Sequence, residues 1–413
     1  MSLREEKGRE IADRYNIVRN GNLWLVPSQG GKGKYKVDAE AGRCTCPDFE
    51  YTGVKCKHQF AVEVTVKREQ KIKTTTDAKG KTTTTTTTTE TVKVKRPTYP
   101  QVWPAYNQAQ TNEKRLFLYL LHQLCQGVGS PSQTGPGRRS FQLEDMIFAM
   151  CFKVYSTVSG RRFVTDLKEA QAKGYLAGLP SYNTIFRYFE SETLTPYLQM
   201  LIEESAAPLA SIEEDFAVDS SGISNCRFYQ WMTAKYSDPH MIEKRDWIKV
   251  HLMCGVKTNI VTSVEITGRH AFDGHYFKPL VETTAKTFAM RQVSADKAYL
   301  SAKNLQTVVD NKAMPYIAFK ANTNPGKRSN PLFRQMYHFY SYNQERFMQN
   351  YHKRSNVETT FHMIKSKFGD AVRSKLERAQ INEVLCKILC HNICCLIQSM
   401  FELGLKPKFF QAA

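Results

Sequence analysis

The feature that most constrains the fold is an alternation of strand-like and helical segments after residue 212, in which two strands lead into an aspartate. Phe216-Ala217-Val218 runs into Asp219, and the run 292–295 runs into Asp296. Two β-rich runs, 248–254 and 260–266, flank Lys257-Thr258-Asn259 and predict a hairpin between these aspartates. Further elements are expected at 277–288 (helix), 301–311 (helix), 316–319 (strand), 356–367 (helix) and 381–403 (helix). The pattern predicts an α/β domain with a mixed sheet.

This order of elements is that of a ribonuclease H-like domain, in which the first and fourth strands are neighbours. Asp219 and Asp296, at the carboxyl ends of these strands, are therefore expected to meet. Glu358 lies on a later helix that can pack across the sheet. A single aspartate at a strand end is more often a helix cap or a turn former, and Asp215 and Asp246 are weaker rivals of Asp219.

Three converging carboxylates suit phosphodiester chemistry. Hydrolysis and transesterification need an activated oxygen nucleophile and a stabilised leaving oxygen, and two metal ions about 3.5–4 Å apart supply both. Magnesium prefers oxygen ligands, largely carboxylates.

The helix around Glu358 predicts a phosphate-handling surface. Tyr351, Arg354, Glu358 and Lys365 all fall within an arc of roughly 60° at about 100° per residue of an α-helix. The alternative is a solvated face, because Arg354 and Glu358 form an i,i+4 pair.

These residues carry a family resemblance. The run YHKRSNVETTFHMIKSKFG, from Tyr351 to Gly369, resembles the Tyr-Arg-Glu-Lys signature of DDE transposases from prokaryotic insertion sequences. The segment DKAY from Asp296 is similar to that family's second motif, and Asp219 in FAVDSSGIS is similar to the first.

The resemblance implies a role for each of these residues. Asp219, Asp296 and Glu358 would bind magnesium or manganese, while Tyr351, Arg354 and Lys365 would contact DNA. The implied reaction cleaves the ends of the element and joins the freed 3′-hydroxyls to target DNA. The implied partners are double-stranded DNA (terminal inverted repeats and target) and a second copy of the chain, in a dimer or larger complex.

One departure concerns a large β-rich insertion that some relatives carry between the second aspartate and the glutamate and use in hairpin processing of DNA ends. Only about 60 residues separate Asp296 from Glu358. Residues 321–350 can hold a small insertion only, and 225–247 is the other place for inserted contacts.

A second motif, near the N-terminus, predicts a metal site. Cys44-x-Cys46 and Cys56-x-His58 supply four soft ligands, which suit tetrahedral zinc in a closed structural site. Pro47 and Gly53 fit a knuckle between the two pairs. The spacing resembles the SWIM zinc finger, a module implicated in binding DNA or protein.

Composition divides the chain into four expected domains: a zinc module at 1–62, a Thr-rich segment at 63–100, a helical DNA-binding domain at 101–206 and a catalytic domain at 207–413. The Thr-rich segment fits two alternatives, a flexible linker or a two-stranded ribbon turning at 77–80, because its valines alternate with polar residues. In the third domain, helices at 161–172 and after Pro180 fit either a helix-turn-helix with Arg187 and Tyr188 exposed or plain packing. Ile185, Phe186 and Phe189 are expected on its buried face.

Charge and cysteine content limit the classes of protein. Lys and Arg number 58 against 39 acidic residues, a net charge of +19, which favours a polyanionic partner over a merely solubilising surface. No signal-peptide run and no stretch of about 18 apolar residues is present, so we expect an intracellular, nucleoid-associated protein without a membrane partner.

Cys386, Cys390 and Cys394 predict a buried helical stripe, not a second metal site. A silent DNA-binding protein and a zinc-dependent adaptor remain as alternatives.

Overall fold

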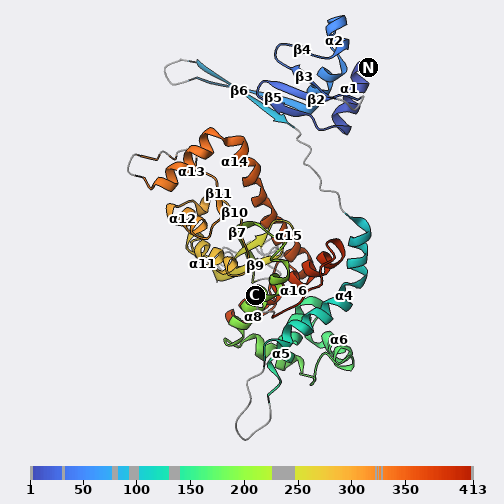
Figure 1. Ribbon diagram of the computed structural model, residues 1–413, viewed down its shortest axis with the longest axis vertical. Coiled ribbons are helices and arrows are strands. Elements are labelled where there is room, and N and C mark those ends of the chain that lie inside the picture. The colour runs from blue at the N-terminus through green and yellow to red at the C-terminus, as the bar shows by residue number, and fades with distance from the viewer. Residues whose placement is uncertain are drawn as a thin grey trace. The chain divides into compact units, whose positions relative to one another are not determined.

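The computed structural model describes residues 3–29, 33–76, 82–92, 102–129, 140–225, 247–320, 323, 325–326 and 329–410. The chain divides into two compact units, Met1–Pro100 and Gln101–Ala413 (Figure 1). Each unit contains its own cluster of buried hydrophobic side chains.

The smaller unit is built on a four-stranded antiparallel sheet in the order β1-β2-β3-β4. Its elements are α1 (Leu3–Arg14), β1 (Val18–Asn20), β2 (Leu23–Pro27), β3 (Lys34–Asp38), β4 (Arg43–Cys44), α2 (Pro47–Thr52) and α3 (Lys57–Thr65). Trp24 and Val26 of β2 alternate with more exposed residues and face α1 and α3 through the buried Ile11 and Ala61.

The Thr-rich segment forms a two-stranded antiparallel ribbon of β5 (Val66–Thr76) and β6 (Thr82–Val92). Its register runs from the pair Val66 and Val92 to the pair Thr76 and Thr82. Of the two alternatives, the described backbone is therefore the ribbon. The expected turn at 77–80 lies outside the described residues.

The larger unit is centred on a five-stranded mixed sheet in the order β11-β10-β7-β8-β9. The strands are β7 (Asp215–Ser224), β8 (Trp247–Gly255), β9 (Val261–Gly268), β10 (Gln292–Ala295) and β11 (Met314–Ile317). β7, β8 and β9 are antiparallel, whereas β7, β10 and β11 are parallel. The expected hairpin is present, and the first and fourth strands of this sheet are neighbours.

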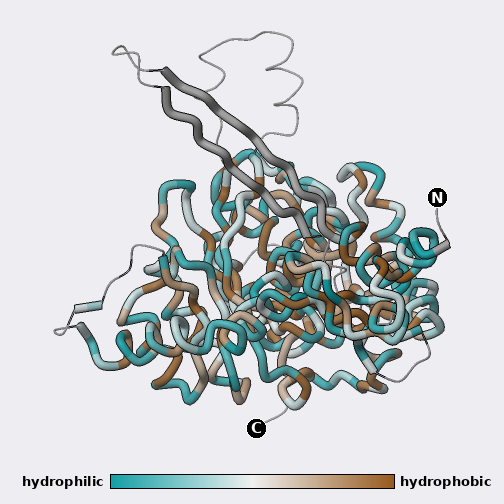
Figure 2. Tube along the Cα trace, turned by 90° about the horizontal axis from the view of Figure 1, so that it is seen from above, coloured by the Kyte–Doolittle hydropathy of each residue, from teal (hydrophilic) through white to brown (hydrophobic). Residues whose placement is uncertain are grey.

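Helices surround this sheet (Figure 1). They are α4 (Trp103–Gln126), α5 (Leu143–Ser156), α6 (Gly160–Ala172), α7 (Tyr182–Phe189), α8 (Leu194–Ala206), α11 (Gly274–Ala285), α12 (Ala302–Asp310), α13 (Pro331–Tyr342), α14 (Gln344–Tyr351), α15 (Ser355–Phe368) and α16 (Glu377–Glu402). Hydrophobic and hydrophilic residues alternate along the trace of most elements (Figure 2), as expected where one face of an element is buried. α15 packs on β7 and β8 on one face of the sheet, and α11 packs on β8 and β9.

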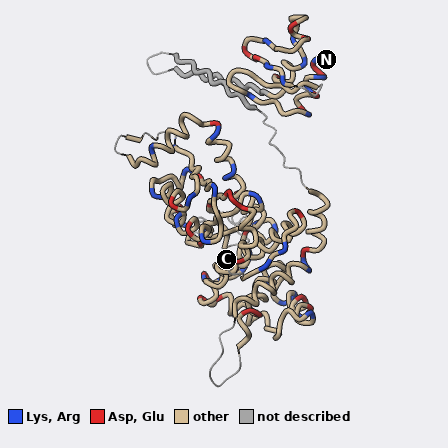
Figure 3. Tube along the Cα trace, viewed as in Figure 1, with Lys and Arg blue, Asp and Glu red and all other residues tan. Residues whose placement is uncertain are grey.

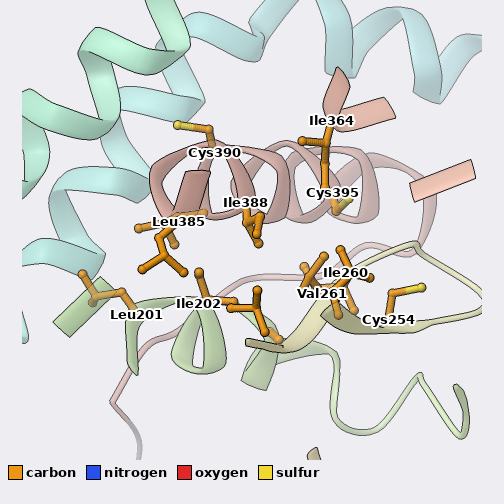
Figure 4. Close-up of a cluster of buried hydrophobic side chains, with 14 of the residues drawn as sticks. Leu201, Ile202, Cys254, Ile260, Val261, Ile364, Leu385, Ile388, Cys390 and Cys395 are labelled. Carbon is orange, nitrogen blue, oxygen red and sulfur yellow. The ribbon is translucent and has the colours of Figure 1, made fainter. Parts of the chain in front are cut away.

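The free edge of β9 is covered by α8 and α16. The side chain of Asn392 in α16 pairs with the backbone of Val261, accepting from its N–H at 2.9 Å and donating to its carbonyl at 2.7 Å. The same amide donates to Ser205 of α8 at 2.9 Å. In Figure 4, Ile388 of α16 lies opposite Ile202 and Val261, whereas Cys390 points to the other side of the helix. The buried amide of Asn392 thus pairs with both backbone groups of Val261, which lie at the edge of the sheet and would otherwise be unpaired.

The helices of 101–206 and the sheet share one hydrophobic core. It extends from Ala109 in α4 to Ile397 in α16, and α16 packs against α4, α5 and α8. A domain boundary was expected between residues 206 and 207. Residues 101–206 and 207–413 instead lie in one compact unit. The physical reason is that α16 is buried on nearly all sides, by the helices as well as by the sheet. Its sequence shows that it is apolar but does not show which elements cover it.

α6 and α7 are consecutive helices, and one aromatic residue of α7, Phe186, is more exposed than expected. Ser181 caps α7, accepting from the Thr184 N–H at 3.2 Å, as its sequence predicted. Ile185 and Phe189 are buried, but Phe186 is 42% exposed and packs against the backbone of Gly160. Phe186 lies about 100° around the helix from Ile185 and so falls off the buried face. Arg187 is exposed and Tyr188 is half-buried.

α16 is the one helix in the described ranges that could cross a membrane by length and composition. Of its most apolar window, 78% is buried inside the larger unit. Cys386 and Cys390 are fully buried in this core, and Cys394 is partly buried, in agreement with the expected stripe.

Candidate active site and metal centre

Asp219 and Asp296 are brought together by the register of two parallel strands. Val218 of β7 pairs with Ala295 of β10, so the next residue on each strand is one of the two aspartates. Asp296 directly follows its strand, as expected. Asp219 lies instead in the middle of the ten-residue strand β7, because the strand continues through Ser224 in pairing with β8.

Arg354 forms hydrogen bonds with both Glu358 and Asp219. Arg354 donates to Oδ2 of Asp219 at 3.2 Å and to Oε1 of Glu358 at 2.6 Å. Glu358 lies in the first turn of α15, which packs on β7. The guanidinium therefore joins the acid of the sheet to the acid of the helix.

The electrostatics of Asp219 reflect crowding by like charges. Burial raises the pKa of this carboxyl, and the negative charges of Asp296 and Glu358 raise it further. The N–H of Ser220 and the guanidinium of Arg354 oppose this shift without cancelling it. A group of carboxylates whose ionisation is resisted in this way can accommodate a cation.

The second motif forms a tight turn around Asp296. Its carboxylate accepts from the Lys297 N–H at 2.7 Å and caps the 3₁₀ turn Lys297–Tyr299. Tyr299 is 1% exposed. Burial raises the pKa of its hydroxyl, the nearby carboxylates of Asp219 and Asp273 raise it further, and Ser220 opposes this shift.

Tyr351 and Lys365 flank the acids from opposite ends of the Glu358 segment. The segment is not one uninterrupted α-helix: α14 ends at Tyr351, a 3₁₀ turn spans His352–Arg354, and α15 then begins. Tyr351 is half-buried and stacks on Phe347 with ring centroids 6.3 Å apart. Lys365 donates to Ser221 of β7 at 2.7 Å, and burial lowers its pKa.

The rival aspartates do not share this environment. Asp215, at the start of β7, accepts two hydrogen bonds from Arg291 at 2.9 and 2.6 Å and one from Lys353 at 2.9 Å. Burial alone would raise its pKa, but these hydrogen bonds lower it overall. Asp215 thus ties β7 to the residue before β10 and to the turn before α15. Asp246 lies outside the described residues.

Sequence reasoning missed several polar residues next to the acids. Ser220 and Ser221 follow Asp219 on β7, and Ser220 donates to Asp273 at 2.8 Å. Lys249 forms an ion pair with the same Asp273 oxygen at 2.7 Å. The serines were visible in the run FAVDSSGIS, but Asp273 lies 53 residues further along the chain, and no local pattern signals that contact.

The two candidate insertions have different outcomes. The described part of 321–350 contains α13 and α14, so the short segment before the glutamate is helical there. Aromatic contacts join it to the sheet, including Phe347 against Tyr316 with centroids 5.3 Å apart. Of the segment 225–247, residues 226–246 lie outside the described part.

The N-terminal cysteines and histidine converge on one point. The ligand atoms of Cys44, Cys46, Cys56 and His58 all lie within 4.8 Å of one another, and all four side chains are buried. Nε2 of His58 is buried without a hydrogen-bond partner in the described structure, as expected of a metal ligand. Within the described ranges this is the only group of three or more potential ligands gathered so closely. The residues present fit zinc.

The knuckle between the two ligand pairs is α2, a helix of six residues. Cys46 caps it, and its sulfur accepts from the Phe49 N–H at 3.4 Å. Pro47 begins the helix, and Gly53 ends it with a left-handed φ of 63°. The donated hydrogen bond of Cys44 lowers the pKa of the Cys56 thiol to about 4.

Comparisons with known families match both sites. The family model of the transposase DDE domain matches residues 211–393, which include the five-stranded sheet, α15 and most of α16. The SWIM zinc finger model matches residues 31–67, which include the four converging ligands. No curated protein matches the chain. The larger unit therefore contains a transposase DDE domain. The smaller unit contains a SWIM zinc finger, so the chain combines this module with a transposase DDE domain.

Proposed function

We propose that this transposase cleaves the ends of its own insertion sequence and joins the freed 3′-hydroxyls to target DNA. The observation that carries the proposal is the contact of one arginine, Arg354, with both Asp219 and Glu358, beside the strand pair that brings in Asp296. This arrangement supports a shared role for the three acids, which come from two neighbouring strands and a helix.

Asp219, Asp296 and Glu358 would hold magnesium or manganese. Bound metal would supply an activated water or 3′-hydroxyl and charge stabilisation at the leaving oxygen. The fit is supported by the chemistry of the three oxygen ligands, by the strand register that sets Asp219 beside Asp296, and by the contact of Arg354 with both Asp219 and Glu358. Arg354 would then be released toward a DNA phosphate, for which its planar guanidinium is suited.

Tyr351 and Lys365 would contribute the remaining phosphate contacts. Both are partly buried against the unit, so little side-chain entropy is lost when they bind. Together with Arg354 and Glu358 they support assignment to the Tyr-Arg-Glu-Lys branch of the family. The strand order is that of the ribonuclease H-like fold. The short, helical segment before α15 does not favour hairpin processing of the ends.

The basic charge supports binding of double-stranded DNA beyond the active site. Lys and Arg are distributed along both units (Figure 3). We assign recognition of the terminal repeats to α6 and α7, where Arg161, Arg162 and Arg187 are exposed. Paired ends require at least a dimer. The protein would act inside the cell, at the nucleoid.

Replacement of Glu358 tests the proposal. Glu358→Gln keeps the shape of the side chain and removes its charge, so magnesium-dependent cleavage of a duplex carrying the short inverted repeats that flank the gene should be lost. Binding of the same duplex should stay nearly unchanged. Glu377→Gln, at an exposed position of α16, is the control and should cleave normally. Equal cleavage by Glu358→Gln and the unaltered protein would sink the assignment.

The alternatives predict other outcomes. A silent DNA-binding protein would bind the repeat duplex but would not cut it with any divalent metal. A zinc-dependent adaptor would bind no repeat duplex through the larger unit.

A further inference from the structure

A buried polar cluster lies on the face of the sheet opposite the three acids. Successive residues of a strand point to opposite faces. Asp219 and Ser221 of β7 contact α15 through Arg354 and Lys365, whereas Ser220 points toward the start of α11. The cluster around Ser220 is therefore directly behind Asp219.

Three side chains lie within 3.3 Å of one oxygen of Asp273. Ser220 donates to Oδ1 at 2.8 Å, and Nζ of Lys249 lies 2.7 Å from the same atom. Nδ1 of His251 lies 3.3 Å from it. The cluster joins β7, β8 and the residue before α11 around a single carboxylate.

The surroundings hold these groups in place. His251 is fully buried, stacks on Tyr276 with centroids 4.5 Å apart, and shares a hydrogen bond of 2.9 Å with Thr267. Lys249 also donates to the carbonyl of Ala271 at 3.0 Å. A carboxylate with this many partners has little freedom to rotate, because each alternative orientation would leave buried donors unpaired.

Ser220 links this cluster to the acids. Its backbone N–H donates to Oδ1 of Asp219 at 2.8 Å, while its side chain is held by Asp273. The hydroxyl of Tyr299, from the turn that begins at Asp296, is buried near Ser220 and makes no hydrogen bond of good geometry among the described residues. Asp219 is thus linked through Ser220 to Asp273, and the Tyr299 hydroxyl lies beside this link.

We propose that Ser220 and Asp273 are positioning residues for the metal-binding acids. Asp273 fixes Ser220, and Ser220 holds Oδ1 of Asp219 so that Oδ2 lies toward Arg354. The proposal rests on the proposed function of these acids. Groups that orient metal ligands in this way typically change metal affinity when they are removed, by about 10- to 100-fold.

The test measures metal binding rather than activity. Binding of Mn²⁺ to the purified full-length protein is followed by the electron paramagnetic resonance signal of free Mn²⁺, without DNA. We expect Ser220→Ala and Asp273→Asn to weaken Mn²⁺ binding by about 10-fold or more. Ser220→Thr keeps the hydroxyl and should restore binding to within about threefold of the unaltered protein, well short of the loss expected on removal.

Two controls separate positioning from folding and from the proposed function. Ser205→Ala removes another buried, hydrogen-bonded serine, which lies in α8 and contacts Asn392 rather than the acids, and should lower the melting temperature without changing Mn²⁺ affinity. Asp219→Asn should abolish the binding. Unchanged affinity in Ser220→Ala and Asp273→Asn, with binding lost in Asp219→Asn, would overturn the positioning role alone. Unchanged affinity in Asp219→Asn would overturn the metal site itself and the positioning role with it.

Discussion

Asp219 and Asp296 occupy equivalent places on adjacent parallel strands, each one residue beyond the pair formed by Val218 and Ala295. The register of the sheet alone therefore sets their separation, and the chain between them is free to vary. In this arrangement burial and the neighbouring acids raise the pKa of Asp219.

Asp219→Asn should raise the melting temperature of the metal-free protein near pH 7. The pKa of Asp219 is raised in the folded state, so the folded state binds more protons and loses stability as the pH rises above the ordinary pKa of an aspartate. The amide removes this penalty. Magnesium should stabilise the unaltered protein, because it binds only the folded state, but not the variant. Calorimetry with and without magnesium measures both effects, and an equal magnesium response in the variant would contradict the prediction.

Asp215→Asn should have the opposite effect at neutral pH. The folded pKa of Asp215 is lowered by Arg291 and Lys353, so its contribution to stability is present above the ordinary aspartate pKa and is lost as the pH falls through the folded value. We expect a loss of about 1–2 kcal/mol near pH 7. The difference between the two proteins should disappear in acid. Urea denaturation across this pH range checks it, with Glu214→Gln as the exposed neighbouring control; a pH-independent difference would argue against the ion pairs.

Cys56→Ser should remove the zinc. Elemental analysis of the unaltered protein should give one zinc per chain, and the variant should contain almost none, because a closed structural site needs all four ligands. Cys394→Ser, outside the cluster, should keep its zinc. Hydrogen exchange should increase across residues 3–65 in Cys56→Ser and stay unchanged across 247–268, since the two units have separate cores. Zinc retained in Cys56→Ser would contradict the ligand assignment.

Asn392→Ala should destabilise the larger unit by about 3 kcal/mol. The substitution leaves the N–H and carbonyl of Val261 unpaired at a covered strand edge and removes a bond to Ser205. Chemical denaturation measures the loss. Gln398→Ala, at a more exposed position of α16, should cost much less. Equal costs for the two variants would show that the amide does not stabilise the edge.

The local signals in the sequence located most elements of the sheet. Residues 292–295 were expected as a strand and form β10 with the same ends, and all four of them are buried. β7 is longer than its apolar part: the run SSGIS has little strand propensity of its own and is extended by pairing with β8. Pairing of this kind depends on a partner that the local sequence does not contain.

The candidate site was predictable where a short motif carries it. Glu358 and Arg354 are four residues apart on one helix, and their contact follows from helical geometry. The contact of Arg354 with Asp219 joins residues 135 positions apart, and only the order of the strands brings them together. The support of Ser220 by Asp273 was not predictable, because it joins residues distant in sequence through ordinary polar side chains.

The position of α16 has a consequence for how the protein is made. This helix is synthesised well after α4, α5 and α8, yet it packs against all three and pairs with the edge of β9. About 200 residues separate the end of α8 from the end of α16, or roughly 10–40 s of translation. During that interval the apolar faces of the early helices have no permanent partner. Nascent chains of this protein should therefore depend on chaperones until α16 has been synthesised.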